Sequence, residues 1–256
     1  MKRFTNRRVL VTGSASGIGQ AIVLRLLDEE AQVVAADIAE DGLAETRAQA
    51  AAAGLDKRLT TMALDIADET SVGEGVAAAI AGLGGLDVLV NAAGMLRGAH
   101  THECSLDLWN QVIGVNLTGT FLMTRAALPA LLETGKGVVV NFSSTSAQFA
   151  HPYMAAYSAS KGGIQAFTHS IALEYAKQGL RAVAIVPGGI SSGITGNIVG
   201  LVPEDVDWNL FAKMSPAIGK GYGKPENVAG VVAMLASDDG AFVTGTEIRV
   251  DGGAHQ

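Results

Sequence analysis

Short apolar stretches rich in β-branched residues alternate with helical patterns along the whole chain. Seven of these stretches are predicted to be strands, at residues 8–12, 32–36, 58–64, 87–91, 137–142, 181–186 and 247–250. Helical patterns lie between them, at residues 17–30, 41–53, 70–81, 105–133 and 225–236 and in the stretch after Tyr157. Strand-helix alternation needs crossover connections, which are right-handed and place helices on both faces of a parallel sheet. The pattern therefore predicts a Rossmann-like, doubly wound α/β fold with a seven-stranded parallel sheet.

The chain is predicted to be a single domain covering residues 1–256. Its 256 residues are 48% apolar, which is enough for one large core, and no linker, repeat or low-complexity segment divides it. The pattern loosens only at about 188–224, and so long a connection is usually functional, so we expect a substrate loop there. Its apolar residues either form a lid over an apolar substrate or pack on the chain's own core or a neighbouring subunit. They are Trp208, Leu210, Phe211 and Met214.

Charge and composition argue against several classes of partner. The net charge of −7 and an isoelectric point near 5.2 disfavour nucleic acid and anionic membranes. No stretch has the length of a membrane span, and the apolar run after the basic start is too short for a secretion signal. The single cysteine, Cys104, excludes an intramolecular disulfide. These observations predict a soluble cytoplasmic protein.

A glycine-rich turn follows the first predicted strand and opens the first predicted helix. It reads Thr12-Gly13-Ser14-Ala15-Ser16-Gly17-Ile18-Gly19. Glycines allow the backbone to approach a pyrophosphate closely, and the helix N-terminus offers N–H donors to it. Because any strand-to-helix turn can use glycine, this turn alone is weak evidence for a nucleotide site.

Asp37, at the end of the second predicted strand, indicates which nucleotide would bind. An acidic residue at about this distance from the glycine turn accepts hydrogen bonds from an adenosine ribose. Its carboxylate would repel a ribose 2′-phosphate, and Ser14-Ala15-Ser16 offers no Lys or Arg to bind one. NAD is therefore favoured over NADP. The alternative is that Asp37 is a helix-capping or solvated acid.

Residues able to bind or react collect where predicted strands end. They are Gly13, Asp37, Asp65, Asn91, Ser144 and Pro187. In a doubly wound sheet the carboxyl ends of the strands form the edge at which ligands bind. Small residues in Asn91-Ala92-Ala93-Gly94 would let a flat ring lie against the backbone there.

Tyr157 and Lys161 stand four residues apart at the head of a predicted helix, so their side chains share one face. A free tyrosine, with a pKa near 10, is a poor base at neutral pH, and a nearby positive charge lowers that pKa. The pair therefore suggests acid/base chemistry, although helix neighbours without function would look the same. A serine at the preceding strand end, Ser144, could donate a hydrogen bond to a carbonyl oxygen.

Together these motifs resemble the short-chain dehydrogenase/reductase family, of the compact single-domain kind, along essentially the whole chain. The matching pieces are Thr12-Gly13-x-x-x-Gly17-x-Gly19, Asn91-Ala92-Ala93-Gly94, Asn116 in Val115-Asn116-Leu117, Ser144, Tyr157-x-x-x-Lys161, Pro187-Gly188 and Thr244-Gly245-x-x-x-x-Val250-Asp251-Gly252-Gly253. Their order is the family's order.

The resemblance implies a role for each matching catalytic residue. Tyr157 would be the general acid/base, and Lys161 would lower its pKa and hold the nicotinamide ribose. Ser144 would bind the substrate oxygen, and it is preferred to Ser143 because the family serine lies thirteen residues before the tyrosine. Asn116 would order the helix and a water leading to Lys161.

The resemblance also implies a set of NAD contacts, with Asp65 beside the adenine. They are Gly13, Ser16, Gly17, Ile18, Gly19, Asp37, Asp65, Ile66, Asn91, Ala92, Gly94, Tyr157, Lys161, Pro187, Gly188, Ile190 and Ser192. The family usually has a threonine five residues past the proline, and here that position is Ser192, which keeps the hydroxyl.

The expected activity is hydride transfer between a small, apolar secondary alcohol or ketone and NAD, in a homotetramer with the helix after Tyr157 and the last strand in its contacts. One alternative is a 3-oxoacyl-thioester reductase using NADPH, which Asp37 disfavours. Another is a catalytically silent NAD-sensing scaffold, since fold does not fix function. His100, His102 and Cys104 lie close together, but nothing nearby completes a set of metal ligands, so no metal is expected.

Overall fold

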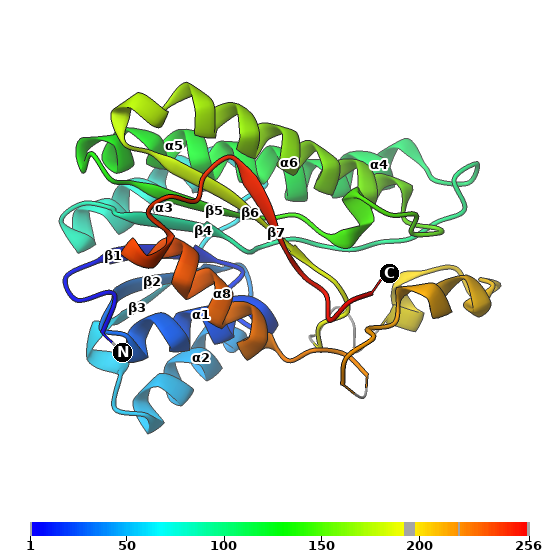
Figure 1. Ribbon diagram of the computed structural model, residues 1–256, viewed down its shortest axis with the longest axis horizontal. Helices are drawn as coiled ribbons and strands as arrows, with labels where there is room; N and C mark the ends of the chain where they lie inside the picture. Colours follow the sequence, from blue (N-terminus) through cyan, green and yellow to red (C-terminus); the bar gives the residue numbers. More distant parts are fainter. Residues whose placement is uncertain (1, 192–197, 220, 255–256) are drawn as a thin grey trace.

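A seven-stranded parallel sheet forms the centre of the molecule (Figure 1). The computed structural model describes residues 2–191, 198–219 and 221–254. Within them the strand order is β3-β2-β1-β4-β5-β6-β7, and each neighbouring pair is parallel. The strands are β1 (Arg8–Thr12), β2 (Gln32–Asp37), β3 (Leu59–Ala63), β4 (Val88–Asn91), β5 (Val138–Phe142), β6 (Arg181–Pro187) and β7 (Thr246–Val250). The predicted doubly wound fold is confirmed.

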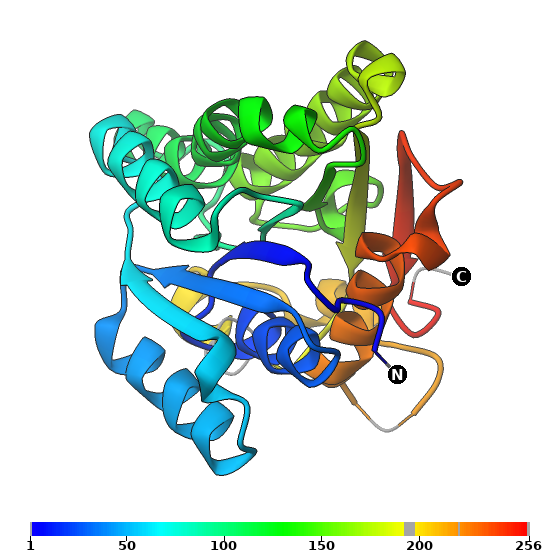
Figure 2. The ribbon, with the colours of Figure 1, turned by 90° about the vertical axis from the view of Figure 1, so that its left-hand side faces the viewer.

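Helices cover both faces of this sheet (Figure 2). On one face α1, α2 and α8 share a core with the strands, and on the other face α3, α5 and α6 share a second core. The helices are α1 (Gly17–Asp28), α2 (Glu40–Ala52), α3 (Glu69–Leu83), α4 (Leu106–Ile113), α5 (Gly119–Glu133), α6 (Ala155–Glu174) and α8 (Pro225–Ala236). None of those described is long and apolar enough to cross a membrane.

The central strands are mostly apolar because each face of the sheet is buried. In β1, Val9 and Val11 belong to the core under α1, whereas Leu10 belongs to the core on the opposite face. Successive side chains of a strand point to opposite faces, so a strand covered on both sides needs a continuous apolar run. This is why the strands could be located from the sequence.

The predicted helix at 105–133 is interrupted. It consists of α4, a π-helical turn over Gly114–Thr118, and α5. Within that turn the Asn116 side chain accepts a hydrogen bond from Met95 N at 2.8 Å and donates one to Met95 O at 2.9 Å. A π-turn adds one residue without ending the helical pattern, so apolar periodicity does not reveal it. Its effect is to anchor Asn116 on the loop after β4.

The ligand-binding edge lies where the chain reverses its direction of progress across the sheet. From β1 the chain moves outward through β2 to β3, and it then returns to place β4 on the other side of β1. In open α/β sheets such a switch point leaves a crevice outside the carboxyl ends of the strands. The glycine turn after β1 and the loop after β4 therefore border one crevice.

Candidate active site

Two adjoining cavities occupy this edge of the sheet. The outer one, the nucleotide cleft, is lined by the glycine turn, the ends of β2 and β3 and the loop after β4. The inner one, the reaction cavity, is lined by the end of β5, the start of α6 and the segments after β6. Ile18, Ala92 and Gly94 line both. A molecule lying along the cleft can therefore reach into the reaction cavity.

Two glycines of the glycine turn stand where any side chain would collide with neighbouring backbone atoms. Gly13 has φ +71°, and a Cβ there would lie 2.6 Å from the Ala93 nitrogen. A Cβ on Gly19 would lie 2.0 Å from the Gly13 oxygen, so α1 packs directly on the turn. Ser16 caps α1 without a side-chain hydrogen bond, and no acidic residue lies in the first turn. The N–H groups at the start of α1 thus suit a pyrophosphate.

The Asp37 carboxylate is fixed at the lip of the cleft by two main-chain donors. Ala15 N donates to Oδ2 and Ala39 N donates to Oδ1, each at 3.0 Å. The next residue, Ile38, is apolar and 70% exposed. A ribose hydroxyl reaching Asp37 would meet a held acceptor, whereas a phosphate would meet a fixed negative charge.

Most of the other predicted cofactor residues also line one of the two cavities. In the nucleotide cleft they are Ser16, Gly17, Ile18, Gly19, Asp65, Ile66, Ala92 and Gly94, and in the reaction cavity Pro187, Gly188 and Ile190. Ser192 lies outside the described residues. Gly94 has a further effect, because a Cβ there would come within 3.4 Å of Lys161 Nζ. Because Gly94 has no Cβ, Lys161 Nζ stays within reach of the nucleotide cleft.

Asn91 is the exception among these predicted contacts, because its side chain lines neither cavity. Its amide nitrogen donates to Thr124 Oγ1 at 3.1 Å and to Asn141 Oδ1 at 2.9 Å beneath the cleft. Asn141 in turn donates to Thr168 Oγ1. The predicted contact of Asn91 with a cofactor is thus restricted to its main chain.

Three of the four predicted catalytic residues line the reaction cavity, and the fourth, Asn116, is buried and does not. Tyr157 and Lys161 stand on the first two turns of α6, and Ser144 follows β5. The Ser144 hydroxyl lies close enough to Tyr157 to lower the pKa of its phenol. Ser143, the alternative serine, instead donates to the Lys161 main-chain oxygen at 2.9 Å. Its hydroxyl therefore helps to hold α6, while that of Ser144 lies beside the tyrosine.

Asn116 supports this group from the π-turn. Besides Met95, its amide nitrogen donates to Ser160 Oγ at 3.0 Å, and Ser160 Oγ donates to Tyr157 O at 2.7 Å. Both Asn116 and Ser160 are fully buried. The π-turn, the loop after β4 and the first turn of α6 are thereby joined under the Tyr157-Lys161 pair.

The electrostatics of the pair differ from the sequence-based expectation that Lys161 lowers the pKa of Tyr157. Burial raises the pKa of Tyr157, and the neighbouring Ser144 hydroxyl opposes that rise. Lys161 Nζ donates to Phe142 O at 2.8 Å and lies 5.6 Å from the Tyr157 ring centroid. Burial also lowers the pKa of Lys161 to about 8. In this geometry the phenol is the favoured form of Tyr157 at neutral pH.

Comparison with known proteins agrees with the fold and the motifs. The sequence model of a family described as enoyl-(acyl carrier protein) reductase matches residues 13–255. The chain is 36% identical over 251 residues to 2,5-dichloro-2,5-cyclohexadiene-1,4-diol dehydrogenase of Sphingobium indicum, covering 98% of this chain and 97% of the relative. It is 36% identical over 253 residues to 2-(S)-hydroxypropyl-CoM dehydrogenase 3 of Xanthobacter autotrophicus, with the same coverage. The crystal structure of levodione reductase superposes with a TM-score of 0.91 at 32% identity, covering 98% of both chains.

The chain belongs to the short-chain dehydrogenase/reductase family. Nicotinamide cofactors are the family's cofactors, and the glycine turn, the open start of α1 and the side-chain-free Gly94 fit such a group.

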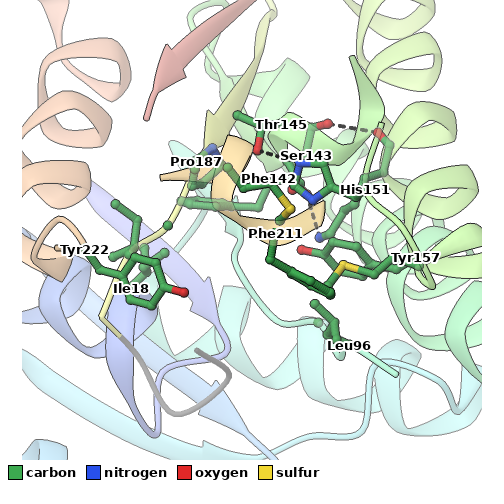
Figure 3. A pocket seen from close by; sticks show the side chains of 18 of the residues that line it. Ile18, Leu96, Phe142, Ser143, Thr145, His151, Tyr157, Pro187, Phe211 and Tyr222 are labelled. Atoms are coloured by element: carbon green, nitrogen blue, oxygen red, sulfur yellow. Dashed lines mark hydrogen bonds between the residues drawn. The ribbon is translucent and has the colours of Figure 1, made fainter. Parts of the chain in front are cut away.

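Several residues of this dehydrogenase/reductase site could not be found from the sequence. They are Leu96, Thr145, His151, Met154 and Tyr222, all of which line the reaction cavity (Figure 3). They lie in loops or at element ends, where no periodicity or family motif marks a side chain as facing a ligand. Thr145 had one weak signal, because it directly follows Ser144.

Residues of the substrate loop take both roles that the sequence left open, as a lid over the cavity and as packing on the chain itself. Phe211 and Met214 line the reaction cavity, as a lid would. Phe211 also stacks on Tyr153, with ring centroids 6.1 Å apart, and packs with Leu96 and Met154. Trp208 and Leu210 are 45% and 46% exposed. The loop is therefore both a wall of the cavity and a small apolar cluster of its own.

His100, which lies before α4, takes part in fastening this loop. His100 Nε2 lies 2.9 Å from Asp205 Oδ1, and Gly98 N donates to Leu201 O at 2.6 Å. Among the described residues, no three histidine, cysteine or acidic side chains are grouped as metal ligands would be. His100 thus joins the loop after β4 to the substrate loop.

Proposed function

We propose that this chain is an NAD-dependent oxidoreductase that interconverts a secondary alcohol and a ketone, with Tyr157 as the general acid/base. The observation that carries the proposal is that the Ser144 and Tyr157 side chains line one cavity, which adjoins the nucleotide cleft, close enough for Ser144 to lower the pKa of Tyr157. Two neighbouring hydroxyls can both contact one substrate oxygen.

The chain's residues would divide the work at that oxygen. Ser144 would hold the substrate oxygen, and Tyr157 would give it a proton during reduction or take one during oxidation. Lys161, at the bottom of the cavity, would bind the hydroxyls of the nicotinamide ribose and stabilise the phenolate. The bound nicotinamide supplies the hydride acceptor or donor. Asn116 would hold α6 and the loop after β4 in fixed positions relative to each other.

Because burial raises the pKa of Tyr157, the protonated phenol is ready to donate, which suits ketone reduction. Oxidation needs the phenolate and so depends more strongly on Lys161. We therefore expect oxidation to have the higher pH optimum of the two directions.

NAD is proposed over NADP because Asp37 faces the cleft with its carboxylate held in place and with Ile38 rather than a cation beside it. A phosphate brought to this point would be repelled by the carboxylate, and neither Ser14-Ala15-Ser16 nor Ile38 offers a positive charge to compensate. NADH should therefore bind at least about tenfold more tightly than NADPH, a ratio that corresponds to about 1.4 kcal/mol. Fluorescence titration with the two nucleotides measures it.

The names of the relatives favour a small alcohol or ketone as substrate. Two are named as dehydrogenases of a cyclohexadiene diol and of 2-(S)-hydroxypropyl-CoM, and a third is named levodione reductase. The apolar residues Leu96, Met154 and Phe211 in the reaction cavity support an apolar carbon skeleton. A cytoplasmic homotetramer completes the proposal.

A 3-oxoacyl-thioester reductase is the second candidate, favoured by the acyl carrier protein in the description of the matching family. Asp37 counts against the NADPH that this activity would use. A catalytically silent NAD-sensing scaffold would need no Ser144-Tyr157 pair.

The Tyr157→Phe variant tests the proposal. It removes the proton donor and keeps the ring, so turnover should fall roughly 10²-fold or more while NADH affinity is retained. Initial rates on cyclic, aromatic and hydroxyacyl alcohols with NAD and NADP measure turnover, and fluorescence titration measures NADH binding. Tyr175→Phe is the matched control, because Tyr175 follows the end of α6 outside both cavities. Near-normal turnover by Tyr157→Phe would contradict the proposed mechanism.

A further inference from the structure

The reaction cavity contains a second polar point beyond the Ser144-Tyr157 pair. Thr145 Oγ1 lies 3.3 Å from His151 Nε2, and both side chains line the cavity. Figure 3 shows Thr145, His151 and Tyr157 on one side of the cavity, with Ile18 and Tyr222 on the other. The two residues, here called the Thr145-His151 corner, take no part in the proton transfer proposed above.

The corner has hydrogen-bonding capacity left for a ligand. A threonine hydroxyl has one donor and two acceptor positions, and the contact with His151 uses one of them. Thr145 is only 2% exposed, so bulk water does not surround its hydroxyl. Buried polar groups normally find partners, and in an enclosed site a ligand oxygen is a suitable one.

The position of the corner follows from that of Ser144. Thr145 is the next residue, and consecutive Cα atoms are about 3.8 Å apart. The Ser144 hydroxyl marks where the reacting oxygen would lie, so the corner faces a neighbouring part of the same small molecule. The short 3-10 turn Thr145–Ala147 and the two hydrogen bonds from Phe149 N and Gln148 N to Thr145 O fix its backbone.

The other walls restrict what can carry that oxygen. Leu96, Met154, Phe211 and Met214 present apolar surface. The cavity measures about 190 Å³, and a cavity of about 150 Å³ holds one benzene molecule. Because the inner residues of the nucleotide cleft line the same space, a nicotinamide ring would take part of it. One small ring or a short chain remains as the carbon skeleton.

We infer that the Thr145-His151 corner binds a second oxygen of the substrate. The preferred substrates are then compact diols, hydroxyketones or diketones with one oxygen at Ser144-Tyr157 and another at the corner. This inference rests on the proposed function and narrows its substrate class. A site built to bond a hydroxyl discriminates against the analogue that lacks it, because the protein's own polar groups would then stay unpaired.

The test compares cyclohexanol with the 1,2-, 1,3- and 1,4-cyclohexanediols, which share one ring and differ in the second hydroxyl. The unaltered protein should give at least one diol about tenfold higher kcat/KM than cyclohexanol. In Thr145→Val, which keeps the shape and removes the hydroxyl, the diol-to-cyclohexanol ratio of kcat/KM should fall about tenfold. Calorimetric binding of the same alcohols to the NADH-loaded protein should show the same loss of ratio.

Two further variants control the comparison. His151→Phe keeps a ring without nitrogen and should lower the same ratio, which covers the case that Thr145→Val is poorly folded. Thr60→Val makes the same exchange at an exposed threonine outside both cavities and should leave the ratio unchanged. Melting temperature and NADH affinity report on folding for each variant.

Equal kcat/KM for cyclohexanol and all three diols in the unaltered protein would overturn the inference and leave the proposed function intact. An unchanged ratio in both Thr145→Val and His151→Phe would overturn it as well. If none of the four probes is turned over, the inference fails, and the wider alcohol screen with Tyr157→Phe judges the proposed function separately.

Discussion

At the scale of single residues, the site depends on two ionisable side chains placed where water is scarce. Lys161 is 5% exposed, and its Nζ donates a hydrogen bond to the Phe142 carbonyl. Burial disfavours the charged form of any group, so it moves the pKa of a lysine down and that of a tyrosine up. The two shifts move the values apart, so Lys161 loses its proton at a lower pH than Tyr157 does.

The lowered pKa of Lys161 makes a prediction about stability. In the folded chain this pKa is about 8, and in the unfolded chain it is near 10.4. Between these values the unfolded state binds more protons, so Lys161 makes the free energy of unfolding rise with pH from about 8 to about 10. Lys161→Met lacks this contribution. Urea unfolding of both proteins across this range should show their difference changing in favour of the unaltered chain as pH rises, and parallel curves would refute the burial effect.

The residues that the sequence located correctly are those whose roles depend on position along the chain. Asp37 and Ser144 follow strands, and strand ends share one edge of a parallel sheet. The sequence does not predict the direction in which a side chain at such a strand end points. Asn91 has the expected position, but its amide turns into the core to pair with Asn141. Tertiary packing determines whether such a side chain points to the cleft or into the core, and a single sequence does not reveal that packing.

At the scale of elements, the strands and most helix bounds followed from apolar patterns, while the π-turn and the course of the substrate loop did not. The loop is held by contacts between residues about a hundred positions apart, such as His100 with Asp205. Local propensity carries no information about such pairs. The apolar residues of the loop were recognisable, but the sequence could not tell Phe211, which lines the cavity, from Leu210, which is largely exposed.

The His100-Asp205 pair predicts that the attachment of the loop depends on pH. The hydrogen bond to Asp205 raises the pKa of His100, and Glu103 adds to this. A raised histidine pKa means that the attachment is complete below about pH 6.5 and is lost as pH rises through the folded value. Trp208 reports on the loop when Trp109 is replaced by Phe. Acrylamide quenching of its fluorescence should increase from pH 6 to pH 8.

Two variants in that background separate the pair from its surroundings. His100→Gln should remove most of the pH dependence of quenching. His102→Gln should keep it, because His102 lies 3.6 Å from Glu103 and has no ion pair with the described part of the substrate loop. If His100→Gln and the parent respond alike, the ion pair does not hold the loop.

At the scale of the whole molecule, apolar side chains are exposed beside the last strand, where the sequence predicts a contact between subunits. Leu173 on α6 is 84% exposed, and Phe242 before β7 is exposed as well. β7 ends the sheet, and the His169-Glu247 contact of 3.1 Å links it to α6. This surface is the one that the sequence predicted to lie between subunits. Exposed apolar patches of this kind often mark interfaces.

Light scattering should therefore give a mass about four times the 26.2 kDa of one chain. Leu173→Arg places a charge on the predicted interface and should give a smaller assembly, because burying an unpaired charge is unfavourable. Ile38→Arg is the matched control, since Ile38 is also exposed and apolar but lies beside the nucleotide cleft. A mass of 26.2 kDa for the unaltered protein would argue against the tetramer.

The buried amides beneath the site have a consequence for how such a protein could acquire new substrates. Asn91 and Asn141 are direct neighbours across β4 and β5, and their side chains bond to Thr124 on α5 and Thr168 on α6. A shift of either strand by one residue would break the bond between the two amides and the bond from the shifted strand to its helix, so this network fixes the alignment of the strands and helices. The residues proposed to select a substrate lie on loops outside this hydrogen-bond network. Exchanging those loops should alter the choice of molecule while the reacting groups stay where they are.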